Sequence, residues 1–131
     1  MNGYLLDTHI WVWELIGSDQ QPGSVKRILQ HCSDSLWLSP ISVWEAGNMV
    51  RTGKLELKCD FSSWVEQALE QMPLKEAPLD YNVVLKTFGL ALEHDDPADH
   101  FLVATALEYD LTLVTVDERL IGRDKLVTFP V

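Results

Sequence analysis

Four acidic residues at different places along the chain are the side chains best suited to do chemistry together. Asp7 directly follows a short apolar run, and Asp117 directly follows a second, longer one. Glu45 and Asp99 instead fall in the early turns of two predicted helices. In an open α/β sheet, sites form outside the carboxyl ends of the strands. The pattern therefore predicts that these four carboxylates meet at one sheet edge.

Carboxylates that converge repel one another, so some of them must take up protons or share a cation. Mg²⁺ and Mn²⁺ prefer oxygen ligands, keep several waters, and are typically held by one or two carboxylates together with a substrate phosphate. Such a site activates water and stabilises the attacking and leaving oxygens of a phosphodiester. The four acids therefore indicate metal-assisted phosphodiester hydrolysis.

Each acid also has a purely structural explanation. Asp7 could simply end its strand, yet an acid that ends a buried strand needs a partner. Asp117 could cap the turn that follows it, and Asp99 could only complement the dipole at a helix start. Glu45 could lie on a solvated helix stripe, although its neighbours are largely apolar. Asp96 is better explained as a helix cap than as a metal ligand.

Short apolar runs alternate with longer helical periodicities, which is typical of an α/β fold with a largely parallel sheet. Buried strands are predicted over residues 4–6, 36–38 and 111–116, with a short edge strand over 127–131. Helices are predicted from a cap at Thr8 to near Gly17, over about 22–29, from Ser39 and Pro40 to near Gly53, from a cap at Asp60 to Met72, after Asp80, and from a cap at Asp96 to Tyr109.

Length and composition restrict the class of protein. The 131 residues contain neither a repeat nor a linker, so residues 1–131 are expected to form a single domain. Ten Lys and Arg stand against 20 Asp and Glu, and this net charge of −10 argues against a protein that coats nucleic acid through bulk charge. It leaves open a nucleic-acid enzyme whose acids hold cations. No signal peptide, disulfide framework or membrane span is visible, so we expect a cytoplasmic protein.

Four sequence motifs resemble those of the PIN domain, and most closely those of the VapC-type toxins of bacterial toxin–antitoxin pairs. They occur in the family's order and span nearly the whole chain; each alone is weak, whereas the four together are specific. The motifs are LLDTH at residues 5–9, SPISVWE at 39–45, DPAD at 96–99 followed by FLVATA at 101–106, and LVTVD at 113–117.

The resemblance implies a three-layer α/β/α sandwich around a mainly parallel sheet, and a ribonuclease that depends on Mg²⁺ or Mn²⁺. In such an enzyme Asp7 and Asp99 are the main metal ligands, Asp117 binds directly or through water, and Glu45 orients or deprotonates the attacking water. The resemblance also implies an endoribonuclease toxin that cuts RNA, forms a homodimer, and is neutralised by a VapB-type antitoxin.

Several further side chains are candidates for supporting roles. The hydroxyls of Thr8 and Thr115 can hydrogen-bond a ligand acid or a metal-bound water, although β-propensity explains Thr115 nearly as well. Where many relatives carry Arg after the third acid, this chain has His100, which leaves the role of that position open. Two basic groups are candidates for contacts to RNA phosphates, and solubilising charges are an equal explanation: Arg51, Lys54 and Lys58, and Arg119, Arg123 and Lys125.

Two other functions remain open from the residues alone. An acid-cluster phosphotransfer domain would use the strand-end Asp as a nucleophile, but such phosphatases usually have a second acid where this chain has His9, and a receiver would have a lysine that residues 114–117 lack. A non-catalytic protein-binding module would use the acids for structure only. The five tryptophans favour either a partner surface, such as a homodimer interface or an antitoxin groove, or a single crowded core.

Overall fold

The structure, a computed structural model, describes residues 3–90, 92, 96–123 and 125–130. Short strands and longer helices alternate along this part of the chain. In order, the elements are β1 (Tyr4–Leu6), α1 (Thr8–Ile16), α2 (Gly23–His31), the 3-10 turn η1 (Ser33–Ser35), β2 (Leu36–Leu38), α3 (Pro40–Arg51), α4 (Phe61–Gln71), β3 (Lys75–Glu76), α5 (Tyr81–Thr87), α6 (Pro97–Glu108), β4 (Thr112–Val114) and β5 (Thr128–Phe129).

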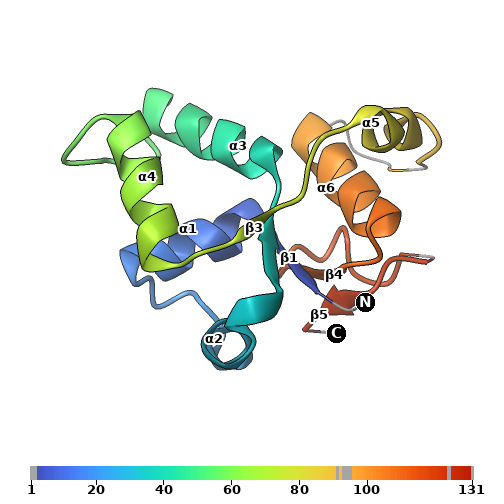
Figure 1. The fold of residues 1–131 in the computed structure, drawn as a ribbon, viewed down its shortest axis with the longest axis horizontal. Coiled ribbons are helices and arrows are strands. Elements are labelled where there is room, and N and C mark those ends of the chain that lie inside the picture. Colours follow the sequence, from blue (N-terminus) through green and yellow to red (C-terminus); the bar gives the residue numbers. More distant parts are fainter. Residues whose placement is uncertain (1–2, 91, 93–95, 124, 131) are drawn as a thin grey trace.

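All strand pairings in the sheet are parallel, and the strand order is β3-β2-β1-β4-β5. The first strand is therefore central, and its Leu5 pairs with Trp37 of β2 on one side and Leu113 of β4 on the other. Helices α1 to α4 lie on one side of the sheet, and α5 and α6 lie on the other (Figure 1). The predicted three-layer α/β/α sandwich around a mainly parallel sheet is confirmed.

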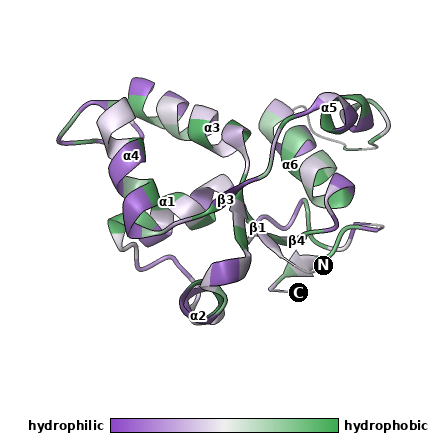
Figure 2. Cartoon of the chain, viewed as in Figure 1, coloured by the Kyte–Doolittle hydropathy of each residue, from purple (hydrophilic) through white to green (hydrophobic). Residues whose placement is uncertain are grey.

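Each face of the sheet carries its own apolar cluster, because successive side chains of a strand point to opposite faces. Leu6 and Val114 belong to the cluster that packs against α1 to α4, around the fully buried Trp11. Leu5 and Leu113 belong to the cluster that packs against α6. Figure 2 shows α6 as largely apolar, in keeping with a helix enclosed between the sheet and α5. Burial of both faces fixes the register of β1 and with it the place where that strand ends.

The helix starts are set by polar caps. Side chains of Ser39, Asp60 and Asp96 accept hydrogen bonds from backbone N–H groups of the helices that follow, as the sequence predicts. The cap of α1 is Asp7 and not Thr8, so that prediction is wrong by one residue: the carboxylate of Asp7 accepts from the Thr8 N–H and begins the helix earlier. The described helices are at most 12 residues long, and none is long and apolar enough to cross a membrane.

Three strands differ from the sequence prediction. The final edge strand, predicted over 127–131, is confirmed as β5 but covers only Thr128–Phe129, and Val131 lies outside the described residues. The fourth strand ends at Val114 instead of Val116, because the chain turns toward Asp117 once Thr115 has paired with Phe129. The edge strand β3 is not predicted at all, since its two exposed polar residues, Lys75 and Glu76, carry no apolar pattern. The early end of β4 places the segment after it at the same sheet edge as the end of β1.

Candidate active site

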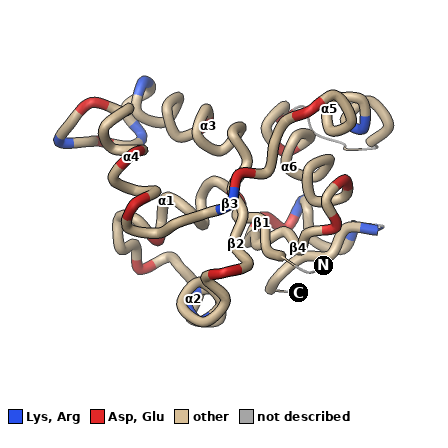
Figure 3. The backbone as a smooth tube through the Cα atoms, in the orientation of Figure 1, with Lys and Arg blue, Asp and Glu red and all other residues tan. Residues whose placement is uncertain are grey.

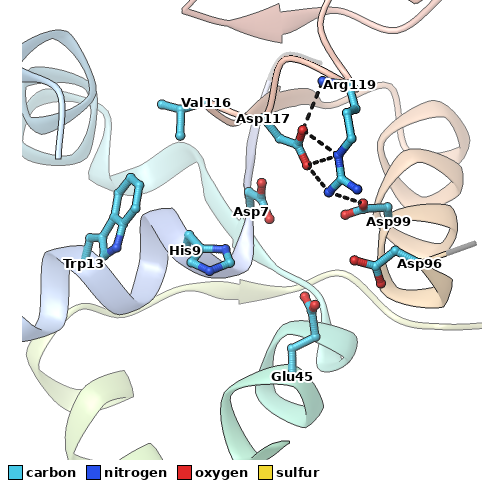
Figure 4. A pocket seen from close by; sticks show the side chains of 9 residues that line it. All are labelled: Asp7, His9, Trp13, Glu45, Asp96, Asp99, Val116, Asp117 and Arg119. Atoms are coloured by element: carbon cyan, nitrogen blue, oxygen red, sulfur yellow. Dashed lines mark hydrogen bonds and ion pairs between the residues drawn. The ribbon is translucent and has the colours of Figure 1, made fainter. Parts of the chain in front are cut away.

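The four acids come together in one pocket at the carboxyl edge of the sheet (Figure 4). Asp7 follows β1, Glu45 lies on α3, Asp99 lies in the first turn of α6, and Asp117 follows β4. The pocket has a volume of about 320 Å³, and its described lining residues are Asp7, His9, Trp13, Glu45, Asp96, Asp99, Val116, Asp117 and Arg119.

Asp7 is the most firmly held of these acids. It is only 8% exposed, its Oδ1 accepts from the Thr8 N–H at 2.7 Å, and its Oδ2 accepts from the Thr115 hydroxyl at 2.6 Å. Burial raises the pKa of Asp7, the hydrogen bond from Thr115 opposes that rise, and the negative charge of Asp99 adds to it. Both oxygens are thus fixed in a carboxylate that the protein environment disfavours in its charged form.

Glu45 is linked to the same wall of the pocket through a hydroxyl. The Thr8 hydroxyl donates to Glu45 Oε1 and also lies 3.0 Å from the Ser42 hydroxyl, so α1 and α3 are joined there. The pKa of Glu45 is raised to about 7, mainly by partial burial. The hydrogen bond from Thr8 lowers this pKa, whereas the negative charges of Asp7 and further acids raise it. This carboxyl is poised to exchange a proton near neutral pH.

Asp99 and Asp117 are held by a guanidinium. Arg119 Nη2 lies 2.7 Å from Asp117 Oδ2 and 3.3 Å from Asp99 Oδ2, and its Nε lies 3.0 Å from Asp117 Oδ1. The Arg119 N–H also donates to Asp117 Oδ1 at 3.0 Å, and the Asp117 N–H donates to the Thr115 hydroxyl at 3.0 Å. The hydrogen bond to Asp117 raises the pKa of Arg119 further above its already high value, so this side chain is always cationic.

Four lining residues are not among the site residues that the sequence predicted: His9, Trp13, Asp96 and Val116. His9 and Trp13 are four residues apart on α1, and their ring centroids lie 5.8 Å apart at one side of the pocket (Figure 4). Their helical spacing carries the signal that could have found them, since residues i and i+4 share a helix face. Val116 has no such signal. Asp96 caps α6, with Oδ1 3.1 Å from the Ala98 N–H, and lines the pocket as well.

The donor set fits a hard divalent cation. Among the described residues, no three carboxylate, imidazole or thiolate groups form a ready-made metal cluster. The groups that face the pocket are nevertheless mainly carboxylates, whose oxygens Mg²⁺ and Mn²⁺ prefer, and these ions commonly use only one or two of them with water for the rest. The buried Asp7 beside the negative Asp99 is also a pair that a cation would relieve.

The basic candidates lie in different places. Arg119 lines the acid pocket, and Arg123 lies one turn further on, with its Nε donating to the Arg119 carbonyl at 3.1 Å. Arg51 bonds Asn48 at the C-terminal end of α3, and Lys54 follows in the next turn, so both lie at the opposite end of that helix from the sheet edge (Figure 3). Of the six basic candidates, therefore, only Arg119 is among the described lining residues of the pocket.

His100 and the aromatic residues complete the list of sequence candidates. His100 is half-buried on α6 and is not among the described lining residues of the pocket. Trp11 and Trp64 pack edge to face with their centroids 5.6 Å apart, which puts Trp64 largely in the core. Trp44 on α3 is instead 58% exposed. The tryptophans therefore serve both the core and the surface.

Known proteins resemble this chain in sequence. The model of the PIN domain family matches residues 4–126. The chain is 27% identical over 121 residues to Ribonuclease VapC22 of Mycobacterium tuberculosis strain H37Rv, a match that covers 92% of this chain and 91% of that protein.

Solved structures show the same fold. VapBC2 from Rickettsia felis, bound to a DNA fragment from their promoter, aligns with a TM-score of 0.73 at 20% identity, and DNA-bound VapBC from Salmonella typhimurium aligns with a TM-score of 0.74 at 15% identity. Each alignment covers 98% of this chain and 97% of the other. Because the family model spans all four acids of the pocket, we conclude that this chain belongs to the PIN domain family.

Proposed function

We propose that the chain is a divalent-metal-dependent endoribonuclease that hydrolyses RNA phosphodiesters, and that it is the cytoplasmic toxin of a VapBC-type pair. The observation that carries this proposal is the convergence of Asp7, Glu45, Asp99 and Asp117 on one pocket from four separate elements. Membership of the PIN domain family and similarity to a protein named Ribonuclease VapC22 favour the same reaction.

Asp7 and Asp99 are the proposed principal ligands of Mg²⁺, or alternatively of Mn²⁺, and Asp117 binds directly or through water. Asp7 and Asp99 are 8% and 5% exposed, so the fold and not solvent sets the direction of their oxygens. A divalent ion in such a site supplies Lewis-acid polarisation of a phosphate and offsets charge on the attacking and leaving oxygens. Thr115 holds Asp7 in place for this role and, through the Asp117 N–H, also orients the third acid.

Glu45 is the proposed general base. With a pKa of about 7, Glu45 is about half ionised at neutral pH and accepts a proton readily in its charged form. Thr8 occupies its Oε1, which leaves Oε2 for the attacking water. The proton that leaves this water would go to Glu45, the P–O bond to the leaving ribose oxygen would break, and that oxygen would take a proton from solvent. No covalent bond between enzyme and RNA is needed.

The basic residues are proposed to contact RNA phosphates. Arg123, whose Nε donates to the carbonyl of Arg119 in the acid pocket, lines a second pocket of about 460 Å³ together with Lys86 and Lys125. Arg51 and Lys54 would meet the RNA only further from the cut. In a chain with a net charge of −10 these contacts fix the register of the RNA without reading its bases.

The proposed antitoxin binds a separate, apolar groove beside strands β2 and β3. This groove has a volume of about 310 Å³ and is lined by β2, α3, α4 and β3, with Leu38, Val43, Leu69 and Leu74 as its apolar side chains. A net charge of −10 favours a basic partner. The related solved structures are of VapBC pairs, which is consistent with a partner of the VapB type.

The proposed homodimer uses the outer face of α5. Tyr81, Val84, Leu85 and Phe88 are spaced as one helical stripe and are all exposed, Phe88 by 85%. The opposite side of the same helix packs on α6 through Val83. Helix α5 is thus apolar on both sides, and its outer stripe suits a second copy of the chain.

An RNA cleavage assay tests the proposed function. Structured and single-stranded RNA are incubated with the parent protein, Asp7→Asn and Asp99→Asn in Mg²⁺, Mn²⁺ or EDTA, and Asp19→Asn, an exposed acid outside the pocket, serves as the matched control. We expect cutting by the parent and the control in either metal, and none in EDTA or by the two pocket variants. Undiminished cutting by Asp7→Asn would contradict the assignment, and a parent that cuts no RNA with either metal would favour a non-catalytic binding module.

A further inference from the structure

The guanidinium of Arg119 is placed where it serves two acids at once. Its Nε and Nη2 form a fork on both oxygens of Asp117, and Nη2 also reaches Asp99 Oδ2 at 3.3 Å. Three carboxylate oxygens that belong to two proposed metal ligands thus share one side chain. Charge-assisted, forked contacts of this kind are the strongest that Arg makes with carboxylates.

The surroundings of Arg119 make this contact more than a surface ion pair. Among the described lining residues of the pocket, five are acids, and Arg119 is the only Lys or Arg. On the other wall, no Lys or Arg is among the described lining residues, and Asp7 and Glu45 accept hydrogen bonds from the hydroxyls of Thr115 and Thr8. The guanidinium therefore offsets negative charge on one wall only, that of Asp99 and Asp117.

We propose that Arg119 is an intramolecular counter-ion that competes with the divalent metal for Asp99 and Asp117 and turns out toward solvent when the metal binds. This inference rests on the proposed function, because it assumes that these two acids take part in metal binding. A guanidinium and a divalent cation on the same carboxylate oxygens repel each other, and the lone pairs that accept from the guanidinium are less available to the ion, so the two cations compete.

The local structure allows Arg119 to leave without unfolding. Its side chain is 55% exposed, whereas that of Asp99 is only 8% exposed, so the cation is the mobile member of the pair. The turn that carries it is closed by the Leu120 N–H, which donates to the Asp117 carbonyl at 3.0 Å, and is anchored by the fully buried Leu120 side chain. A rotation of the Arg119 side chain alone therefore removes the guanidinium from both acids while the backbone, with the bond from the Arg119 N–H to Asp117 Oδ1, stays in place.

Competition predicts that removal of the guanidinium strengthens metal binding. Exposed ion pairs contribute up to about 1 kcal/mol, which converts to a gain of about fivefold in metal affinity when the competitor is lost. The same removal must weaken the ion-free protein, because Asp99 and Asp117 then lose their counter-ion. A residue that merely positioned the two acids for the metal would have the opposite effect on affinity.

The test is an isothermal titration of Mn²⁺ into ion-free parent, Arg119→Gln and Arg119→Lys at low ionic strength. The matched control is Arg27→Gln, an exposed arginine of α2 outside the pocket. We expect the dissociation constant for Mn²⁺ to fall about fivefold in Arg119→Gln, to change less in Arg119→Lys, and to stay the same in Arg27→Gln. In EDTA we expect a lower Tm for Arg119→Gln than for the parent. At saturating Mn²⁺ we expect the difference in Tm between the two proteins to be smaller.

The outcomes separate this proposal from the function on which it rests. Equal or weaker Mn²⁺ binding by Arg119→Gln, with normal binding by the parent, overturns the counter-ion and leaves the metal site intact. Binding by Arg119→Gln but not by the parent supports strong competition. If no variant binds Mn²⁺ at millimolar concentration, both the counter-ion and the metal dependence of the proposed function are wrong.

Discussion

The two walls of the acid pocket keep like charges together by different means. On one wall the buried Asp7 and the partly buried Glu45 accept hydrogen bonds from threonine hydroxyls, and their pKa values are raised. On the other wall Asp99 and Asp117 share the exposed guanidinium of Arg119. The first wall is therefore fixed in advance by the strands and helices that carry it, whereas the second can rearrange by the movement of one side chain.

The largest expected contrast between the walls is in catalysis. Asp7→Asn should lower kcat by about 100-fold or more, since several kcal/mol of transition-state stabilisation depend on the fixed ligand. The loss of kcat in Asp117→Asn should be about tenfold smaller than in Asp7→Asn. Asp117 is not one of the two principal ligands, and the Asn amide oxygen can still accept the hydrogen bond from the Arg119 N–H that shapes the turn. Single-turnover cleavage at saturating Mg²⁺ measures both. An Asp117→Asn variant as impaired as Asp7→Asn would remove the contrast.

Thr115 is the residue on which the fixed wall depends most. Thr115→Val removes the hydrogen bond to Asp7 Oδ2 and the acceptor of the Asp117 N–H, so unfolding by urea should show a loss of about 1–3 kcal/mol. Thr105→Val is the matched control, a buried threonine whose hydroxyl donates to the Phe101 carbonyl within α6. An equal loss in the two variants would mean that the bonds to the acids add nothing to stability.

Glu45 should make the stability of the ion-free protein depend on pH. Its pKa is raised from 4.5 to about 7 by folding, so between these values the native state binds more protons and the free energy of unfolding falls as pH rises. Glu45→Gln should therefore be more stable than the parent above pH 7, by about 1 kcal/mol after solvent screening, and the difference should vanish toward pH 4.5.

Chemical denaturation in EDTA from pH 5 to pH 8 measures this effect. Glu66→Gln, which changes an exposed acid of α4, is the control and should leave the unfolding free energy unchanged within about 0.5 kcal/mol. A gain in stability for Glu45→Gln that is the same at every pH would argue against a proton on Glu45.

The smallest expected effects concern the RNA. Arg123→Gln should weaken RNA affinity in Ca²⁺ by a few-fold and lower the slope of log affinity against log salt by about 0.7, as for one phosphate contact on a single strand. Arg51→Gln should change both quantities less, because it lies at the far end of α3. Unchanged affinity and salt slope in both variants would remove these residues from the RNA path.

The sequence predicted the strand ends and helix starts that carry the four acids, because these are marked by neighbouring residues in the chain. Apolar runs followed by an acid mark the ends of β1 and β4, and the pairs Ser39–Pro40 and Asp96–Pro97 mark helix starts. Because sites in α/β sheets form at the carboxyl ends of the strands, these marks were enough to predict that the four acids meet at one edge. The errors are local as well. Asp7 caps α1 in place of Thr8 because one carboxylate serves both as strand end and as cap.

The remaining features depend on contacts between distant segments. The edge strand β3 has no apolar pattern of its own and forms only because β2 offers a free edge. The pairing of Arg119 with Asp99 joins residues 20 positions apart, and the bond from Thr8 to Glu45 joins residues 37 apart. Neither composition nor spacing contains those distances, so the raised pKa of Glu45 could not be predicted from the sequence.

The most direct measurement is the anomalous diffraction of crystals grown with Mn²⁺. We predict a peak in the pocket with oxygens of both Asp7 and Asp99 at roughly 2.0–2.3 Å, and Arg119 turned away from Asp99. A structure at saturating Mn²⁺ with no peak between these two acids, or with one elsewhere on the molecule only, would contradict the account.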